Sequence, residues 1–114
     1  MVYKVFDDDK LIAEIKVDGK LVTFVNYTED ILKKPFGVKK EVNIADFDNF
    51  VKSRCLPKNR HNVGKFLDKI DLGVFRPIDI IKVTNGFMAE DHIWILHEGE
   101  KKSWKDVKEF NESL

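Results

Sequence analysis

Cysteine is almost absent from this chain of 114 residues, which contains only Cys55. A single cysteine cannot form an intramolecular disulfide, and it has no cysteine partners for a zinc site. The histidine nearest to it in sequence, His61, does not lie at a spacing typical of a catalytic Cys–His pair. We therefore expect Cys55 to be a small, partly buried residue with a structural role.

Long apolar runs are also missing, since no stretch approaches the roughly 18 residues that a membrane helix needs. The amino terminus lacks the apolar segment of a secretory leader, so we expect a cytoplasmic protein with no membrane role. The sequence contains no Gly-rich phosphate loop and no GxSxG, HExxH or CxxC motif. We predict that the protein is not an enzyme and has no catalytic residues, no cofactor and no metal.

The composition is that of one folded domain spanning residues 1–114. Apolar residues make up 43% and aromatic residues 11%, which is sufficient for a core without metal or disulfide support. The charged fraction of 35% is high, but charges alternate with apolar residues, which argues against disorder.

The first 26 residues predict an antiparallel meander of three short strands. Apolar and polar side chains alternate from Leu11 to Val17, with the period of about two that is typical of a strand. Turns are expected at Asp7–Asp9 and at Asp18-Gly19, because Asp-Gly between alternating segments is a strong hairpin signal. The third strand is expected over Lys20–Asn26. Residues 27–42 are expected to form a solvated, lysine-rich loop in which Phe36 reaches the core.

The remaining residues predict an α+β domain with three central helices, one further strand and a C-terminal helix. The central helices are expected from the N-cap Asn43 to shortly before Pro57, from about Asn59 to Ile70, and from Pro77 to Asn85-Gly86. The fourth strand is expected over His92–His97 because its centre is apolar and β-branched. Ser103, with Asp106 three residues later, predicts the start of the last helix.

Net charge is zero, but the segment 52–65 contains five basic residues and no acidic residue. It spans a helix end, a turn with proline and the start of another helix, a geometry that suits anions. The predicted binding residues in it are Arg54, Lys58, Arg60, His61 and Asn62. The alternative is that these side chains pair with acidic stretches of the same fold. Overall neutrality argues against dedicated DNA binding.

The second candidate is the turn 85–92, in which Glu90, Asp91 and His92 are consecutive. They could ligate a metal, but neighbouring strand residues point to opposite faces, so we favour no metal here. We expect the acidic residues to bond to the turn backbone or to face the basic segment. An Arg60–Asp91 or Arg54–Glu90 pair would be an example.

Three segments, Arg54–Asn62, Pro77–Ile81 and Gly86–Ile95, resemble those of a group of small uncharacterised proteins from Firmicutes and their mobile elements, including phages. Some of that group are encoded beside HipA-like kinases of toxin–antitoxin type. The meander from Tyr3 to Phe24 is also loosely similar to the small N-terminal subdomain of HipA kinases. The resemblance implies a companion or regulator of such a kinase. It implies no catalytic residue.

Two functions therefore remain in view. The first is a non-enzymatic protein-interaction or regulatory module whose partner is a protein, contacted through the turns at Arg54–Asn62 and Glu90–His92. The alternative is a nucleic-acid-associated protein that binds through the basic segment 52–65.

Overall fold

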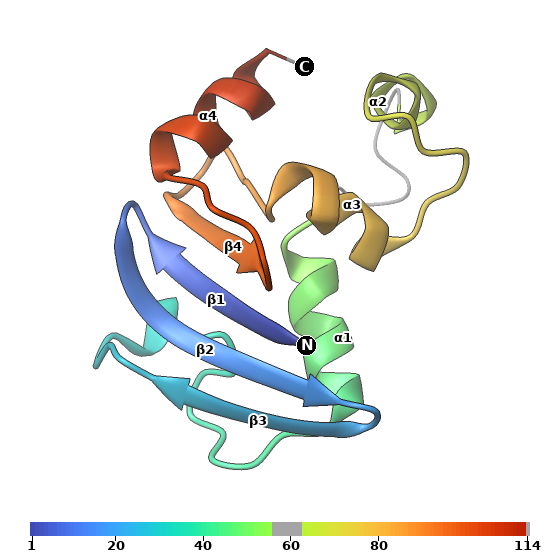
Figure 1. Ribbon diagram of the computed structural model, residues 1–114. Coiled ribbons are helices and arrows are strands. Elements are labelled where there is room, and N and C mark those ends of the chain that lie inside the picture. The colour runs from blue at the N-terminus through green and yellow to red at the C-terminus, as the bar shows by residue number, and fades with distance from the viewer. Residues whose placement is uncertain (56–62, 114) are drawn as a thin grey trace.

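The computed structural model describes residues 1–55 and 63–113, with the side chain of Val63 left out. The chain folds into one four-stranded antiparallel sheet and helices, as expected for an α+β protein (Figure 1). The elements in chain order are β1 Val2–Asp7, β2 Lys10–Asp18, β3 Leu21–Asn26, the 3-10 helix η1 Ile31–Lys33, α1 Ile44–Ser53, α2 Val63–Lys69, α3 Pro77–Thr84, β4 Ile93–His97 and α4 Trp104–Glu112.

The first three strands form the expected meander. Its turns contain Asp8 and Gly19, both in the left-handed region with φ of 54° and 61°, which Asp tolerates better than most residues and Gly adopts without a steric penalty. The strand β4 then pairs antiparallel with β1, which gives the sheet order β3-β2-β1-β4. Because of this pairing, the start of β4 lies beside the turn between β1 and β2.

A bulge in β2 departs from the strict alternation predicted for this strand. The register opposite β1 passes from Val5–Ala13 to Phe6–Leu11, so Ile12 is an extra residue on β2. Ile12 and Ala13 are consequently both buried, with 1% and 0% of their surface exposed. Beyond the bulge the pairing continues through Phe6–Leu11 and Asp7–Lys10 to the β1–β2 turn.

The helices begin and end where short-range chemistry predicts. Asn43 and Ser103 each form a complete capping box with the aspartate three residues later, Asp46 and Asp106. Pro77 occupies the first turn of α3, and Asn85 ends that helix in the left-handed conformation, with φ of 56°. The expected start of the second helix, near Asn59, lies outside the described residues.

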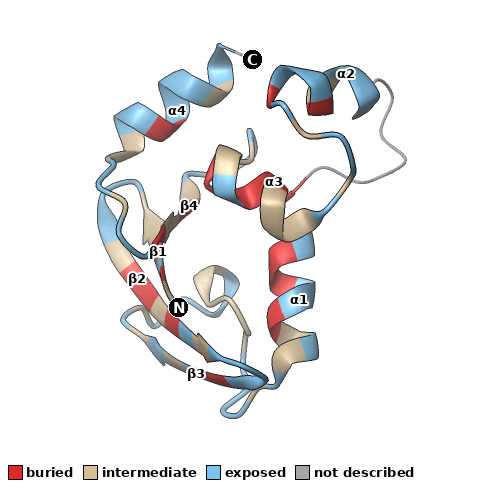
Figure 2. Cartoon of the chain, turned by 45° about the vertical axis from the view of Figure 1, so that its right-hand side comes forward, coloured by how far each residue is buried: buried red, intermediate tan, exposed pale blue. Residues whose placement is uncertain are grey.

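The core lies between one face of the sheet and the helices α1 and α3 (Figure 2). Its most buried members include Val5, Ile15 and Ile81, each with no exposed surface. Burying such a side chain contributes roughly 1.5–3 kcal/mol. Cys55 is also buried, and burial raises the pKa of its thiol. No helix in the described part of the chain is long and apolar enough to cross a membrane.

The segment 27–42 is mostly irregular and none of its residues is buried, as expected for a solvated loop. It contains η1, and its Phe36 packs between Phe24 of β3 and Phe50 of α1, with ring centres 5.0 and 5.9 Å away. The prediction that Phe36 reaches the core is confirmed. Phe110 of α4, in contrast, is 44% exposed.

Candidate functional site

Arg54, the first predicted binding residue, is buried at the end of α1 and bonded within the fold. Its Nε donates to the carbonyl oxygen of Gly86 at 3.0 Å, and Nη2 donates to that of Ile93 at 2.6 Å. Nη1 and Nη2 also donate to the two carboxylate oxygens of Asp91, at 2.7 and 2.9 Å. Such a two-bond pair uses the rigid fork of the guanidinium group, which lysine lacks. Arg54 thus fastens α1 to the segment before β4.

Asp91 is held by the same contacts. Burial alone would raise the pKa of this carboxyl, but Arg54 and the Ile93 N–H, at 3.0 Å from Oδ1, outweigh burial. The pKa of Asp91 is therefore held below its ordinary value. The expectation that an acid of this turn faces the basic segment describes Asp91, which pairs with Arg54. Arg54 thus pairs with Asp91 and not with Glu90, whereas Arg60, named in the other example, lies outside the described residues.

The backbone around this ion pair is equally constrained. Gly86 has φ of 69°, and an added Cβ would lie 3.1 Å from Ile95 Cδ1 and 3.3 Å from Arg54 Cβ. The preceding Asn85, which is 2% exposed, donates from Nδ2 to the carbonyl oxygen of Ile95 and to Glu100 Oε1, both at 2.9 Å. The segment 85–93 is therefore a junction between α1, α3 and β4.

Of the other predicted binding residues, the structure describes only Glu90 and His92. Lys58, Arg60, His61 and Asn62 lie outside the described residues. Glu90 is exposed. His92, which immediately precedes β4, faces Asp8 in the β1–β2 turn.

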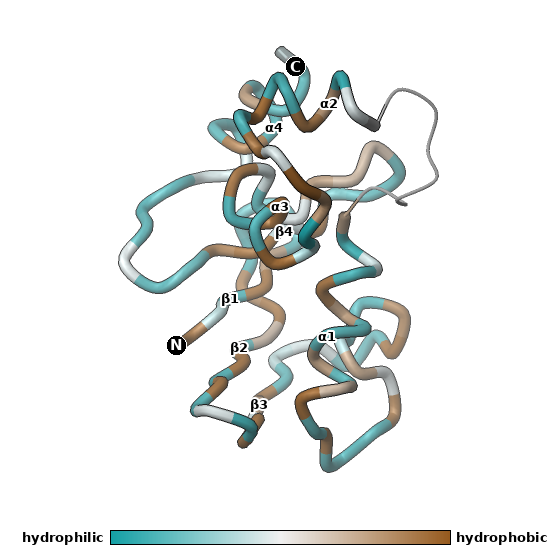
Figure 3. Tube along the Cα trace, turned by 90° about the vertical axis from the view of Figure 1, so that its right-hand side faces the viewer, coloured by the Kyte–Doolittle hydropathy of each residue, from teal (hydrophilic) through white to brown (hydrophobic). Residues whose placement is uncertain are grey.

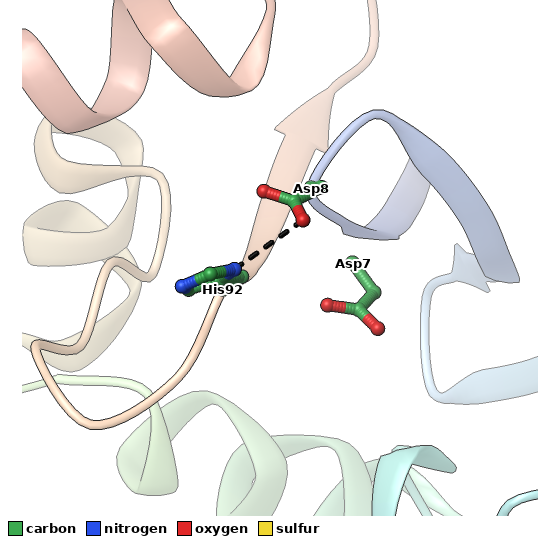
Figure 4. Close-up of side chains that lie close together, drawn as sticks. All are labelled: Asp7, Asp8 and His92. Carbon is green, nitrogen blue, oxygen red and sulfur yellow. Dashed lines mark hydrogen bonds and ion pairs between the residues drawn. The ribbon is translucent and has the colours of Figure 1, made fainter.

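His92 instead lies beside two aspartates from the opposite end of the sequence (Figure 4). Its Nδ1 is 3.3 Å from Asp8 Oδ2, and the potential ligand atoms of Asp7, Asp8 and His92 all lie within 4.8 Å of one another. The backbone fixes this arrangement, since the Asp8 N–H donates to the His92 carbonyl oxygen at 2.9 Å. Sequence reasoning considered only the acids adjacent to His92 and missed those that strand pairing brings to it.

A shallow groove of about 420 Å³ lies between β3 and the segment 31–40. Apolar side chains and lysines line it together, and no described lining residue is acidic; the lining residues are Phe24, Asn26, Ile31, Lys34, Gly37, Val38, Lys39 and Lys40. The chain from β3 to α1 correspondingly carries apolar and hydrophilic positions side by side (Figure 3). Sequence reasoning dismissed this segment because a lysine-rich loop is usually just solvated.

Two features of the groove suggest a binding surface. Ile31 and Val38, which both line it, are 52% and 75% exposed, so two large apolar side chains are open to solvent in one groove. Asn26 Oδ1 is also buried without a hydrogen-bond partner among the described residues. A buried amide of this kind is costly unless something bonds to it.

No family model matches this chain, and neither a curated protein nor a solved structure matches it significantly. What the protein does must therefore be inferred from its own geometry.

Proposed function

We propose that this protein is a non-enzymatic interaction module that binds an acidic, extended segment of a partner protein in the groove between β3 and residues 31–40. The observation that carries the proposal is the combination in one groove of exposed apolar side chains with lysines and no acid among the described lining residues.

The charges and apolar side chains of the groove determine which kind of ligand fits it. Lys34 and Lys40 make no ion pair among the described residues, so their charges are available to a partner. Lys39 already forms an ion pair within the fold, because its Nζ lies 2.5 Å from Asp46 Oδ1. Ile31 and Val38 offer apolar contacts between the charges. A peptide with acidic residues around one apolar side chain complements this pattern.

The resemblance described above makes a HipA-like kinase the first named partner to examine. Nucleic acid is the weaker alternative, because the guanidinium group of Arg54 is already bonded to Asp91 and to two carbonyl oxygens. A phosphate would have to displace those contacts.

The experiment is a titration of isotope-labelled protein with an acidic peptide that carries one central leucine, followed by amide NMR. We expect saturable shifts at Asn26, Ile31 and Val38, and loss of those shifts in the double variant Lys34→Glu/Lys40→Glu. The matched control is Lys101→Glu/Lys105→Glu, which reverses two exposed lysines near α4.

Shifts that persist in the Lys34→Glu/Lys40→Glu variant would contradict the proposal, as would shifts centred outside the groove. A duplex of nucleic acid is titrated in parallel. Tighter binding of the duplex than of the peptide, weakening as salt rises, would instead favour the nucleic-acid alternative. Purified HipA-like kinase then replaces the peptide, and the same pair of variants tests whether it uses the same surface.

A further inference from the structure

Asp91 and His92 are consecutive residues with opposite surroundings. Asp91 is bonded to Arg54 inside the fold, whereas His92 lies on the surface beside Asp7 and Asp8. We propose that Asp7, Asp8 and His92 form a binding site for a divalent transition-metal ion such as Zn²⁺. This site does not depend on the groove or on the proposed function.

The donor set is the first support. One imidazole and two carboxylates are ligands that zinc and neighbouring transition metals accept, and the imidazole distinguishes this set from a group of exposed acids. Three protein ligands leave a further position open to water or to a ligand, as in many zinc sites.

The spacing is the second support. A tetrahedral ion with bonds of about 2.1 Å holds its ligand atoms about 3.4 Å apart. The corresponding atoms here lie within 4.8 Å of one another, and His92 Nδ1 is already 3.3 Å from Asp8 Oδ2. The His92 and Asp8 side chains are 61% and 57% exposed, so rotation of these side chains can close the remaining distance (Figure 4).

The scaffold is the third support, because the ligands come from rigid backbone. Asp7 belongs to the last pair of the β1–β4 ladder, opposite Ile93. The carbonyl oxygen of Asp8 accepts a hydrogen bond from Trp94 Nε1 at 2.6 Å. The His92 ring also packs against Trp104, with ring centres 5.1 Å apart. Metal binding therefore requires little ordering of the chain, which favours affinity.

One contact competes with the metal and supplies a sharp test. Lys33 Nζ donates to Asp7 Oδ2 at 2.6 Å, and this contact raises the pKa of Lys33. A metal ion must take this carboxylate from the lysine. Removing Lys33 should therefore tighten metal binding, whereas removing the neighbouring Lys34, which has no ion pair with Asp7, should change it less.

The test is calorimetric titration of the protein with Zn²⁺ alone. We expect one saturable site per chain, weakened at least about 10-fold by Asp8→Asn or His92→Gln, because even loss of an outer-shell partner costs about 10–100-fold in metal affinity. Lys33→Ala should tighten binding by several-fold more than the matched Lys34→Ala. Glu90→Gln, which removes an exposed acid two residues from His92, should leave binding unchanged.

Localisation by NMR keeps the test decisive if a variant folds poorly. In the unaltered protein, Zn²⁺ should first shift the His92 ring, the Asp7 and Asp8 amides and the Trp104 indole. The proposal is overturned by non-saturating binding at millimolar zinc, or by zinc shifts away from these residues. Equal effects of Lys33→Ala and Lys34→Ala would also overturn it, because Asp7 would then not be a ligand.

Discussion

Two basic regions of this protein have opposite surroundings. Arg54, at the end of α1, is buried and makes four hydrogen bonds to an aspartate and two carbonyl oxygens. Lys34 and Lys40, beside β3, line an open groove with exposed apolar side chains. The planar guanidinium group can satisfy several buried acceptors at once, whereas the strongly hydrated ammonium group of lysine stays at the surface. Local charge density in the sequence therefore does not distinguish a basic side chain bonded within the fold from one that is open to solvent.

The largest expected loss of unfolding free energy comes from a substitution in the buried region. Arg54→Met removes the guanidinium group that pairs with Asp91 and donates to the carbonyl oxygens of Gly86 and Ile93. Loss of one partner from a buried pair costs about 3–5 kcal/mol. Because Asp91 retains contact with water, we expect the lower end of that range. Chemical denaturation measures the free energy of unfolding. A loss below that of an ordinary surface substitution would show that the junction is not structural.

Gly86→Ala tests the same junction from the backbone. The added methyl group meets Ile95 and Arg54 in a left-handed conformation that alanine disfavours. We expect a loss of about 1–3 kcal/mol. Gly64→Ala should cause no loss, because nothing lies within 4 Å of the new Cβ and alanine is favoured over glycine in a helix such as α2 by roughly 0.5–1 kcal/mol. Equal losses at the two sites, measured by thermal unfolding, would argue against close packing at Gly86.

A third prediction concerns the stability of the protein at low pH. The pKa of Asp91 is lower in the folded chain than in the unfolded chain, where it is about 3.9. Its contribution to stability is thus complete above about pH 5 and is lost progressively as pH falls through the folded value. Asp91→Asn lacks this contribution at every pH. The stability curves of variant and unaltered protein should therefore converge in acid, and a constant difference would contradict the Arg54–Asp91 pair.

The smallest expected effect on stability is at the groove. Lys34→Glu/Lys40→Glu alters two lysines without ion pairs among the described residues, so each change should stay within about 0.5 kcal/mol of neutral. A large loss of unfolding free energy would mean that these lysines support the fold and are not free to bind a partner.

Local signals allowed much of the fold to be predicted. Asp18-Gly19 specifies a hairpin, and Asn43 and Ser103 specify helix starts, because each acts within a few residues. The pairing of β4 with β1 could not be predicted in this way, since it joins the two ends of the chain. The contact of Asp8 with His92 could not be predicted either, because these residues are 84 positions apart in the sequence. The bonding of Arg54 likewise depends on Gly86 and Asp91, which no local pattern connects to it.

The most direct test of the contrast between the two basic regions is the affinity of one acidic peptide for three proteins: the unaltered chain, Lys34→Glu/Lys40→Glu and Asp91→Asn. Binding should be lost only in the groove variant, whereas Asp91→Asn should bind as tightly as the unaltered protein in spite of its lower stability. Retained binding in the groove variant, together with altered binding in Asp91→Asn, would return the contact surface to the Arg54 junction and contradict the account.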